Sequence, residues 1–281
     1  MKFYLGTDNA AWLWRMQVPL FMGRNRLYKR KTRYPRATVE WACDSGGFTE
    51  LGMHGKWTVP AKTYAVELQR FSDELGSLQW AAPQDWMCEP HMLAKTGLTV
   101  QEHQTRTIAS VLELRALGAP VIPVLQGWAP GDYWDHIEQY DKAGIDLRDE
   151  HTVGLGSVCR RQNEREIALL IRGLSRVGLR LHGFGIKGAA LARCGLLLES
   201  ADSMAWSFAG RRRPDESCPK RTCHSCEHYA LDWRTKALDK IDPASIYYAP
   251  PSGASDLRIK STLEANKRRY EKHLALLSKE G

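Results

Sequence analysis

The sequence lacks any apolar run that approaches the roughly 20 residues needed to cross a bilayer. Its first residues, MKFYLGTDNAAWLW, also lack the charged, apolar and cleavage regions of a secretion signal. We therefore expect no membrane partner and a location in the cytoplasm. Apolar residues are not scarce overall, since 43% of the 281 residues are hydrophobic. This fraction excludes a disordered chain and allows one large core or two small ones.

Cysteine is sparse and unevenly placed. There are seven cysteines, an odd number, and four of them are scattered along the chain. The other three are bunched in CPKRTCHSCEH, as Cys218, Cys223 and Cys226. An odd and uneven set of this kind is not typical of a disulfide framework. It favours a reduced compartment and a metal site, because thiolates so near one another rarely occur without a metal.

Acidic residues are fewer than basic ones, with 32 Asp and Glu against 40 Lys and Arg, and the net charge is +8. The excess is clustered at 24–36, 211–213 and 267–272. Clustered cations favour a polyanionic partner such as nucleic acid. Any one cluster is also typical of an ordinary solvated surface. The three together favour nucleic acid.

Short apolar runs closed by Gly, Asp or Pro predict eight buried strands. They lie at 2–7, 17–22, 39–44, 78–85, 120–127, 151–157, 179–185 and 197–202. Helical patterns with apolar residues at spacings of three and four lie between most of them, at 61–75, 100–117, 132–144 and 163–178. Alternating strands and helices predict an α/β fold with a parallel sheet, and eight strands favour a closed (β/α)₈ TIM barrel.

The domain organisation follows from this pattern. We expect a catalytic barrel over 1–210, followed by a zinc-binding segment and a C-terminal helix, from about 259 to 278, packed on the barrel over 211–281. In a TIM barrel, the chemistry lies at the carboxyl ends of the strands. Polar residues and glycines stand there, namely Asp44, Asp85, Gln126, Gly156, Ser157, Gly183, Gly185 and Asp202. Asp and Gly also end strands because they suit turns. However, several polar residues follow apolar runs in the same direction along the chain, which favours an active site.

The stretches CDSGGF, VLQG, VGLGS, HGFGIK and SADSMAW occur in this order, before the cysteine cluster. Over roughly residues 39–230 the chain therefore resembles the tRNA-guanine transglycosylase superfamily. Within this region, the chain is most similar to the DpdA-type deazapurine DNA modification proteins, in the motifs PQDWMCEP, VLQGW, SVCRRQ and SADSMAWS. That branch acts on DNA and occurs in phages and bacteria, so the location would be the host cytoplasm for a phage protein.

The resemblance implies roles for individual residues. Asp202 matches the nucleophile and Asp44 the acid/base group. The base-binding positions that it implies are Ser45, Phe48, Asp85, Gln126, Gly127, Gly156, His182 and Gly183. Two positions depart from the pattern, because Ser157 replaces a Glu and His182 takes the place of a Met that stacks on the base.

The implied function is that of a DNA-guanine transglycosylase, a glycosyltransferase of the pentosyltransferase type. It would exchange guanine in DNA for a 7-deazaguanine such as preQ0 (7-cyano-7-deazaguanine) through a covalent Asp-glycosyl intermediate. Two alternatives stay open, the same reaction on tRNA and a catalytically inactive, zinc-containing nucleic-acid binding protein. Relatives often form homodimers, which extends to this chain only by analogy.

The cysteine cluster resembles the structural zinc site of the superfamily, so Zn²⁺ is the expected cofactor. Cys218, Cys223 and Cys226 would be ligands, although the first spacing is longer than in the family. The fourth ligand stays open between His228, which we favour, His224 and His273. Because the segment follows the last strand, the metal would hold the C-terminal part together and take no part in the chemistry.

Overall fold

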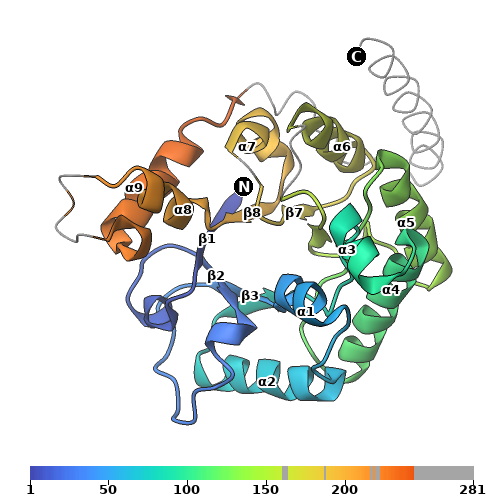
Figure 1. Ribbon diagram of the computed structural model, residues 1–281, viewed down its shortest axis with the longest axis horizontal. Helices are drawn as coiled ribbons and strands as arrows, with labels where there is room; N and C mark the ends of the chain where they lie inside the picture. The colour runs from blue at the N-terminus through green and yellow to red at the C-terminus, as the bar shows by residue number, and fades with distance from the viewer. Residues whose placement is uncertain (160–163, 187, 216–217, 219–221, 244–281) are drawn as a thin grey trace.

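The computed structural model describes residues 1–159, 164–186, 188–215, 218 and 222–243. Eight parallel strands form one sheet, in the order β4-β3-β2-β1-β8-β7-β6-β5 (Figure 1). They are β1 (Lys2–Thr7), β2 (Leu20–Gly23), β3 (Trp41–Asp44), β4 (Leu78–Ala81), β5 (Val124–Leu125), β6 (Val153–Leu155), β7 (Leu181–Gly183) and β8 (Ser200–Ser203). A parallel bridge between Ala81 and Val121 links β4 to the segment leading into β5. The sheet is therefore curled and TIM-like, and the expected α/β class is confirmed.

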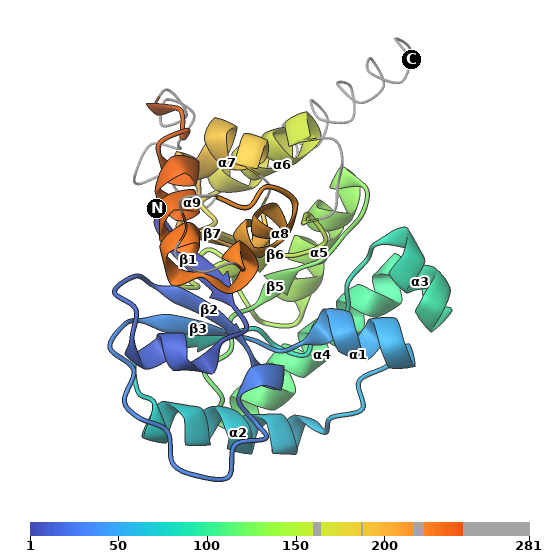
Figure 2. The same cartoon turned by 60° about the vertical axis from the view of Figure 1, so that its left-hand side comes forward.

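Helices follow the strands and surround the curled sheet, as two views show (Figures 1 and 2). In the described residues they are α1 (Gly47–His54), α2 (Ala61–Glu74), α3 (Pro90–Thr96), α4 (Val100–Ala116), α5 (Pro130–Lys142), α6 (Glu164–Arg176), α7 (Gly188–Cys194), α8 (Ala205–Arg212) and α9 (Glu227–Leu238). Short 3-10 helices are η1 (Ala10–Trp14), η2 (Arg24–Arg26), η3 (Gly195–Leu197) and η4 (Cys223–Ser225). The four expected helices correspond to α2, α4, α5 and α6.

An aromatic cluster occupies the middle of the curled sheet. Tyr4, Ala42, Trp80 and Ile122 are buried together, and Phe21 and Phe184 pack against them. Two larger apolar clusters fill the space between the sheet and the helices, one on the side of β5 to β8 and one on the side of β1 to β4. The interior is thus packed, and the space for a ligand lies above the aromatic cluster, at the carboxyl ends of the strands.

The segment after the last strand packs on the first strand. Trp206 on α8 stacks on Trp12 with 5.3 Å between ring centroids, and its indole N–H donates to the carbonyl of Gly6 at 2.8 Å. Trp233 on α9 lies 6.4 Å from the ring of Phe3. These contacts fix the start of the C-terminal segment against the barrel. The C-terminal helix expected near 259–278, with its basic residues and His273, lies outside the described residues.

Among the described residues, no helix combines the length and apolar character needed to cross a membrane.

Candidate active site

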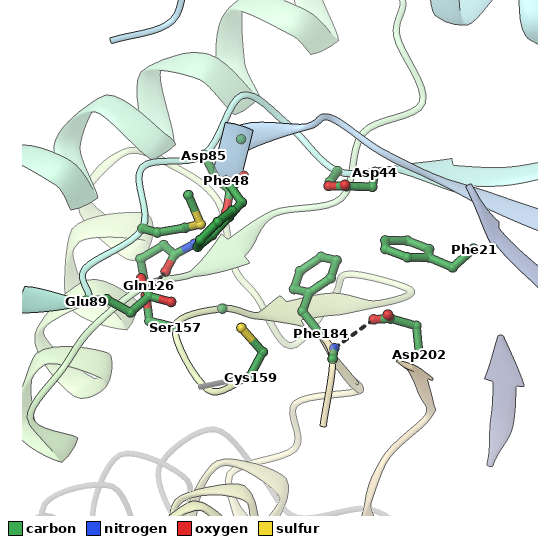
Figure 3. A pocket seen from close by; sticks show the side chains of 15 residues that line it. Phe21, Asp44, Phe48, Asp85, Glu89, Gln126, Ser157, Cys159, Phe184 and Asp202 are labelled. Atoms are coloured by element: carbon green, nitrogen blue, oxygen red, sulfur yellow. Dashed lines mark hydrogen bonds between the residues drawn. The ribbon is translucent and has the colours of Figure 1, made fainter. Parts of the chain in front are cut away.

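A cavity of about 220 Å³ opens at the carboxyl ends of the strands (Figure 3). Several of the polar residues expected at strand ends line it, together with aromatic and sulfur-containing side chains. The lining residues are Phe21, Asp44, Gly47, Phe48, Ala82, Asp85, Met87, Glu89, Gln126, Gly156, Ser157, Cys159, Phe184, Gly185 and Asp202. Four carboxyl groups, those of Asp44, Asp85, Glu89 and Asp202, thus line one mostly apolar cavity that opens to solvent, and their protonation states decide its charge.

Asp44 ends β3 and is held by the turn that starts α1. Gly46 has φ +86°, in the left-handed region that favours glycine, and α1 begins at the next residue. The backbone N–H groups of Gly46 and Ser45 donate to the Asp44 carboxylate, which lowers its pKa. Burial has the larger effect, and with the charge of Asp202 it raises the Asp44 pKa to about 6. A carboxyl of this kind changes protonation near neutral pH and suits acid/base chemistry.

Asp202 lies on β8 and is held from β7 and the loop that follows it. One of its carboxylate oxygens accepts the backbone N–H of Gly185 at 2.9 Å and lies 3.3 Å from Nε2 of His182. His182 is fully buried, and its other ring nitrogen lies 2.9 Å from the hydroxyl of Ser200. Gly185 has φ +56°, so glycine is needed at this contact. Asp202 is therefore held in a fixed orientation at the wall of the cavity.

Asp85 stands in a loop after β4 that one face of α4 holds in place. The hydroxyls of Ser110 and Thr107 accept the backbone N–H groups of Gln84 and Trp86, at 3.0 and 2.9 Å. On the same buried face, Nδ1 of His103 lies 2.7 Å from the carbonyl of Met87. The polar residues at 103, 107 and 110 thus provide hydrogen-bond partners for the backbone of residues 84–87, whereas Ala82 still donates to the carbonyl of Cys43 on β3 at 2.8 Å. β4 itself ends at Ala81, before the predicted end at 85.

Asp85 is buried beside Gln126, whose amide Nε2 lies 2.5 Å from its carboxylate. Burial raises the Asp85 pKa to about 7, and the charges of Asp44 and Glu89 add to this effect, while the hydrogen bond from Gln126 opposes it. Gly156 lets the Gln126 side chain pass, because a Cβ there would lie 2.3 Å from Nε2. Asp85 and Gln126 therefore form one hydrogen-bonded unit at this end of the cavity.

Two residues outside the cavity hold the backbone of Gln126. Its N–H donates to Nδ1 of His136 at 2.9 Å, and its carbonyl accepts from the side-chain amide of Gln104 at 2.8 Å. Burial lowers the His136 pKa to about 3, so the ring stays neutral and Nδ1 remains an acceptor. Gln126 is fixed at its backbone as well as at its side chain.

A family model supplies the decisive comparison. The model of "DeoxyPurine in DNA protein A" (DpdA) matches residues 1–269, which is nearly the whole chain. The chain belongs to the DpdA family. This family modifies DNA with a deazapurine, as a transglycosylase-type enzyme, and the expected resemblance is confirmed. No curated protein matches the chain.

In this DpdA protein, six residues expected to be catalytic or base-binding line the cavity, namely Asp44, Asp202, Phe48, Asp85, Gln126 and Gly156. The other four do not. Ser45 and His182 are buried outside it, and a Cβ on Gly127 or Gly183 would collide with side chains at 2.8 or 2.0 Å. These glycines thus make room for packing. A motif gives the position of a residue in the sequence, but it does not show whether the side chain lines the cavity or is buried behind the cavity wall.

Other residues on the cavity wall were missed. Phe184 lines the cavity two positions after His182, whereas His182, expected at the place of a stacking Met, does not. Phe21, Met87, Glu89 and Cys159 also line it. Glu89 could have been found, since it stands in the motif PQDWMCEP four residues after Asp85. Phe21 precedes a strand end and gives no such signal.

The basic segment 24–36 does not surround the cavity. Arg24 is buried in an ion pair with Glu67 of α2. Further along, the Tyr34 N–H donates to Glu74 and the carbonyl of Thr32 accepts from Arg70, both in the C-terminal half of α2. The segment therefore runs along the flank of the molecule. By contrast, Arg211, Arg212 and Arg213 are exposed at the end of α8, the helix that directly follows β8 and Asp202.

The three clustered cysteines of the DpdA chain lie in the described part. The sulfur atoms of Cys218 and Cys226 are 3.3 Å apart, whereas Cys223 is buried with its sulfur 3.3 Å from the backbone nitrogen of Asp215. His224 and His228 lie on either side of Cys226 in the sequence. Within the described residues, no group of three or more His, Cys, Asp or Glu is arranged as a metal site. Thiolates are typical ligands of zinc, and two of the three sulfur atoms, those of Cys218 and Cys226, lie next to each other in space.

Proposed function

We propose that this protein is a DNA-guanine transglycosylase that exchanges guanine in DNA for a 7-deazaguanine such as preQ0. The observation that carries the proposal is the convergence of Asp44 and Asp202 on one cavity. The pKa of Asp44 depends on the charge of Asp202, which supports their acting on one substrate. The match to the DpdA family favours DNA over tRNA as the polymer.

Asp202 is proposed as the nucleophile. Its carboxylate would attack C1′ of the target deoxyguanosine, and the bond from C1′ to N9 of guanine would break. The product is an Asp202–deoxyribosyl ester, which keeps the DNA strand intact and avoids an abasic site. The contacts from Gly185 and His182 orient the carboxylate and leave its second oxygen available for attack.

Asp44 is proposed to move the protons. In the protonated form it would give its proton to the departing guanine, and in the ionised form it would take one from N9 of the incoming base. That base would then attack C1′ and release Asp202. Because the charge of Asp202 contributes to the raised pKa of Asp44, forming the ester lowers that pKa. Asp44 is thus a better acid once attack has begun.

The base is proposed to lie between aromatic side chains and to be read by the polar end of the cavity. Phe21, Phe48 and Phe184 provide apolar walls, and Asp85 accepts from the N–H donors of a guanine edge. The Gly156 N–H already donates to the carbonyl of Leu125 at 2.9 Å. This N–H is therefore engaged within the sheet and is not proposed to donate to the O6 atom of the base. A target base must leave the helix stack to reach this cavity.

DNA is proposed to approach over α8. Phe208 is 56% exposed, and the guanidinium of Arg212 lies 4.2 Å from its ring centroid. An exposed ring with a stacked cation suits an unstacked base and its phosphate. Arg211 and Arg213 add positive charge on the same helix end.

Structural zinc on Cys218, Cys223 and Cys226 is also proposed, with His228 or His224 completing the site. Zinc would supply a cross-link between the segment after α8 and the start of α9. The buried Cys226 precedes α9 directly, so its position fixes that helix. Metal analysis of purified protein should find about one zinc per chain; far less would reject the site.

The function is tested in cells that express the protein and contain a 7-deazaguanine supply. DNA and tRNA are digested separately, and the nucleosides are analysed by mass spectrometry. A deazaguanine deoxynucleoside in DNA, absent with Asp202→Asn, is the expected result. Modification confined to tRNA would favour the tRNA reaction, and modification of neither polymer would favour the inactive binding protein.

A further inference from the structure

Ser157 occupies an unusual backbone position at the polar end of the cavity. Its φ is +55°, which residues other than glycine rarely adopt. Its buried hydroxyl lies near three groups, the N–H of Cys88 at 2.8 Å, Oε1 of Gln126 at 2.6 Å and Oε2 of Glu89 at 3.0 Å. These neighbours hold the hydroxyl in one place.

If Asp85 and Glu89 are both ionised, there are too few hydrogens for every hydrogen bond around Ser157 to form. A hydroxyl has one hydrogen to donate and accepts two bonds. The N–H of Cys88 brings its own hydrogen, but Gln126 Oε1 and an ionised Glu89 both need the single hydrogen of Ser157. One of them would then face the hydroxyl oxygen with no hydrogen between, which is costly for buried groups.

One additional proton satisfies every bond, in either of two arrangements. In the first, protonated Glu89 donates to Ser157, Ser157 to Gln126, and Gln126 to ionised Asp85. In the second, the Gln126 amide is turned over, which its shape allows. Protonated Asp85 then donates to Gln126, Gln126 to Ser157, and Ser157 to ionised Glu89. Both arrangements place one proton on the two carboxyls taken together.

We propose that Asp85 and Glu89 form a carboxyl pair that holds one proton through Gln126 and Ser157, and that both carboxyls read the donor edge of the base. This inference rests on the proposed function and deepens it. Each carboxyl uses one oxygen in the chain of bonds, and its second oxygen is an acceptor in both arrangements. A guanine-type edge offers N–H donors at N1 and N2, which matches two acceptors, whereas an adenine-type edge alternates donor and acceptor.

The pair also accounts for the departure at 157. The superfamily pattern has a Glu at this position, and here the shorter Ser157 hydrogen-bonds to Glu89 from the loop after β4. Glu89 is buried and lines the cavity. The carboxyl that the motif lacks at position 157 is thus supplied by Glu89, the residue that precedes α3.

Burial and the nearby carboxylates favour retention of the proton. Burial, then the charge of Asp44, then that of Glu89 raise the Asp85 pKa to about 7. Arg106 lies over the ring of Trp86, 4.6 Å from its centroid, on the side of α4. The other charged or titratable groups near the pair are His103 on α4, Asp132 on α5, Cys88 and Cys159 in the loops, and Asp202 on β8.

Calorimetry with 7-cyano-7-deazaguanine and no DNA tests the pair directly between pH 6 and 8.5. Wild-type affinity should fall about tenfold as pH rises through 7 and the proton is lost. Glu89→Gln copies the protonated acid and does not titrate, so its affinity should not fall between pH 6 and pH 8.5 as that of the wild type does. Glu89→Ala should bind at least about tenfold more weakly throughout. Hypoxanthine, which lacks the 2-amino donor, should bind about tenfold or more weakly to the wild type.

The control is Glu113→Gln, the same chemical change at an exposed position on α4, which should behave as the wild type. Three results would overturn the pair. They are a Glu89→Gln variant whose affinity has the wild-type pH dependence, a Glu89→Ala variant with wild-type affinity, and a wild type that binds no purine. DNA exchange is measured in parallel. Base binding that depends on Glu89 without exchange would reject the proposed function alone, and exchange that is indifferent to Glu89 would reject the pair alone.

Discussion

Asp44 and Asp202 face one cavity from strands that are not neighbours. In the sheet, β2 and β1 lie between β3 and β8, so the curl of the sheet brings the two carboxyls to the same space. Burial and then the charge of Asp202 raise the Asp44 pKa to about 6, although backbone N–H groups oppose them. A change of charge at Asp202 therefore alters the proton affinity of Asp44.

This coupling predicts opposite pH dependences for the two half-reactions. Release of guanine from DNA needs protonated Asp44, so its single-turnover rate should fall about tenfold per pH unit above 6. Capture of the incoming base needs ionised Asp44, so its rate should fall at low pH, with a midpoint below 6 because Asp202 is then an uncharged ester. Rapid-quench measurements of each step check this. Equal slopes in both steps, or unchanged profiles in Asp44→Asn, would refute the assignment of Asp44.

Asp85→Asn should stabilise the protein in alkaline solution. The Asp85 pKa is about 7 in the folded protein, against about 3.9 when unfolded, so its contribution to stability is full below pH 3.9 and is lost as pH rises through 7. The amide copies the protonated acid and does not titrate. The free energy of unfolding of the variant should therefore exceed that of the wild type at pH 8 by up to about 4 kcal/mol, and by much less at pH 5. Denaturant titrations at both pH values check this, and a gap that does not grow with pH would count against a buried Asp85 with a raised pKa.

Gly156→Ala should disrupt the polar end of the cavity with little effect on the fold. The added Cβ would lie 2.3 Å from Gln126 Nε2, so the Gln126 side chain must move away from Asp85 and Ser157. We expect affinity for 7-cyano-7-deazaguanine to fall at least about tenfold. Gly131→Ala is the matched control, because no atom lies within 4 Å of its added Cβ. Equal affinities for the two variants would show that Gln126 does not organise the base site.

Phe208→Ala should weaken DNA binding and leave base binding unchanged. Loss of one stacked base costs about 1–3 kcal/mol, which corresponds to about a 5- to 150-fold loss of affinity. Val66→Ala is the control, since Val66 is 62% exposed but lies on α2. Arg212→Gln should reduce the slope of log affinity against log salt by about 1. Fluorescence anisotropy with single-stranded and duplex DNA measures both effects, and normal DNA affinity in Phe208→Ala would place the DNA elsewhere.

The strands were predictable because each buried parallel strand is a short apolar run with a polar or glycine stop, as in WACD before Ser45. Each of the eight expected runs overlaps a strand, although β2 and β8 end one residue beyond the predicted runs, and the longest helical patterns correspond to α2, α4, α5 and α6. The short helices α1, α3, α7 and α8 were not predicted, nor was α9. In α1, only eight residues follow a glycine turn, which is too few for a clear periodicity.

The cavity was only partly predictable. Its two central carboxyls follow apolar runs, and the motif order identified them. The supporting contacts could not be read in the same way, because they join side chains far apart in sequence. The buried polar face of α4 at His103, Thr107 and Ser110 holds a loop whose position only the folded structure reveals. Likewise, the contact between Glu89 and Ser157 spans 68 positions.

The most direct measurement is the site of covalent attachment between protein and DNA. Wild-type protein is incubated with guanine-containing DNA, quenched under denaturing conditions and digested, and the modified peptide is sequenced by mass spectrometry. The account predicts a deoxyribosyl ester on Asp202, and no adduct in Asp202→Asn, whose DNA affinity should stay within about twofold of the wild type. An adduct on another residue, or base exchange that persists in Asp202→Asn, would contradict it.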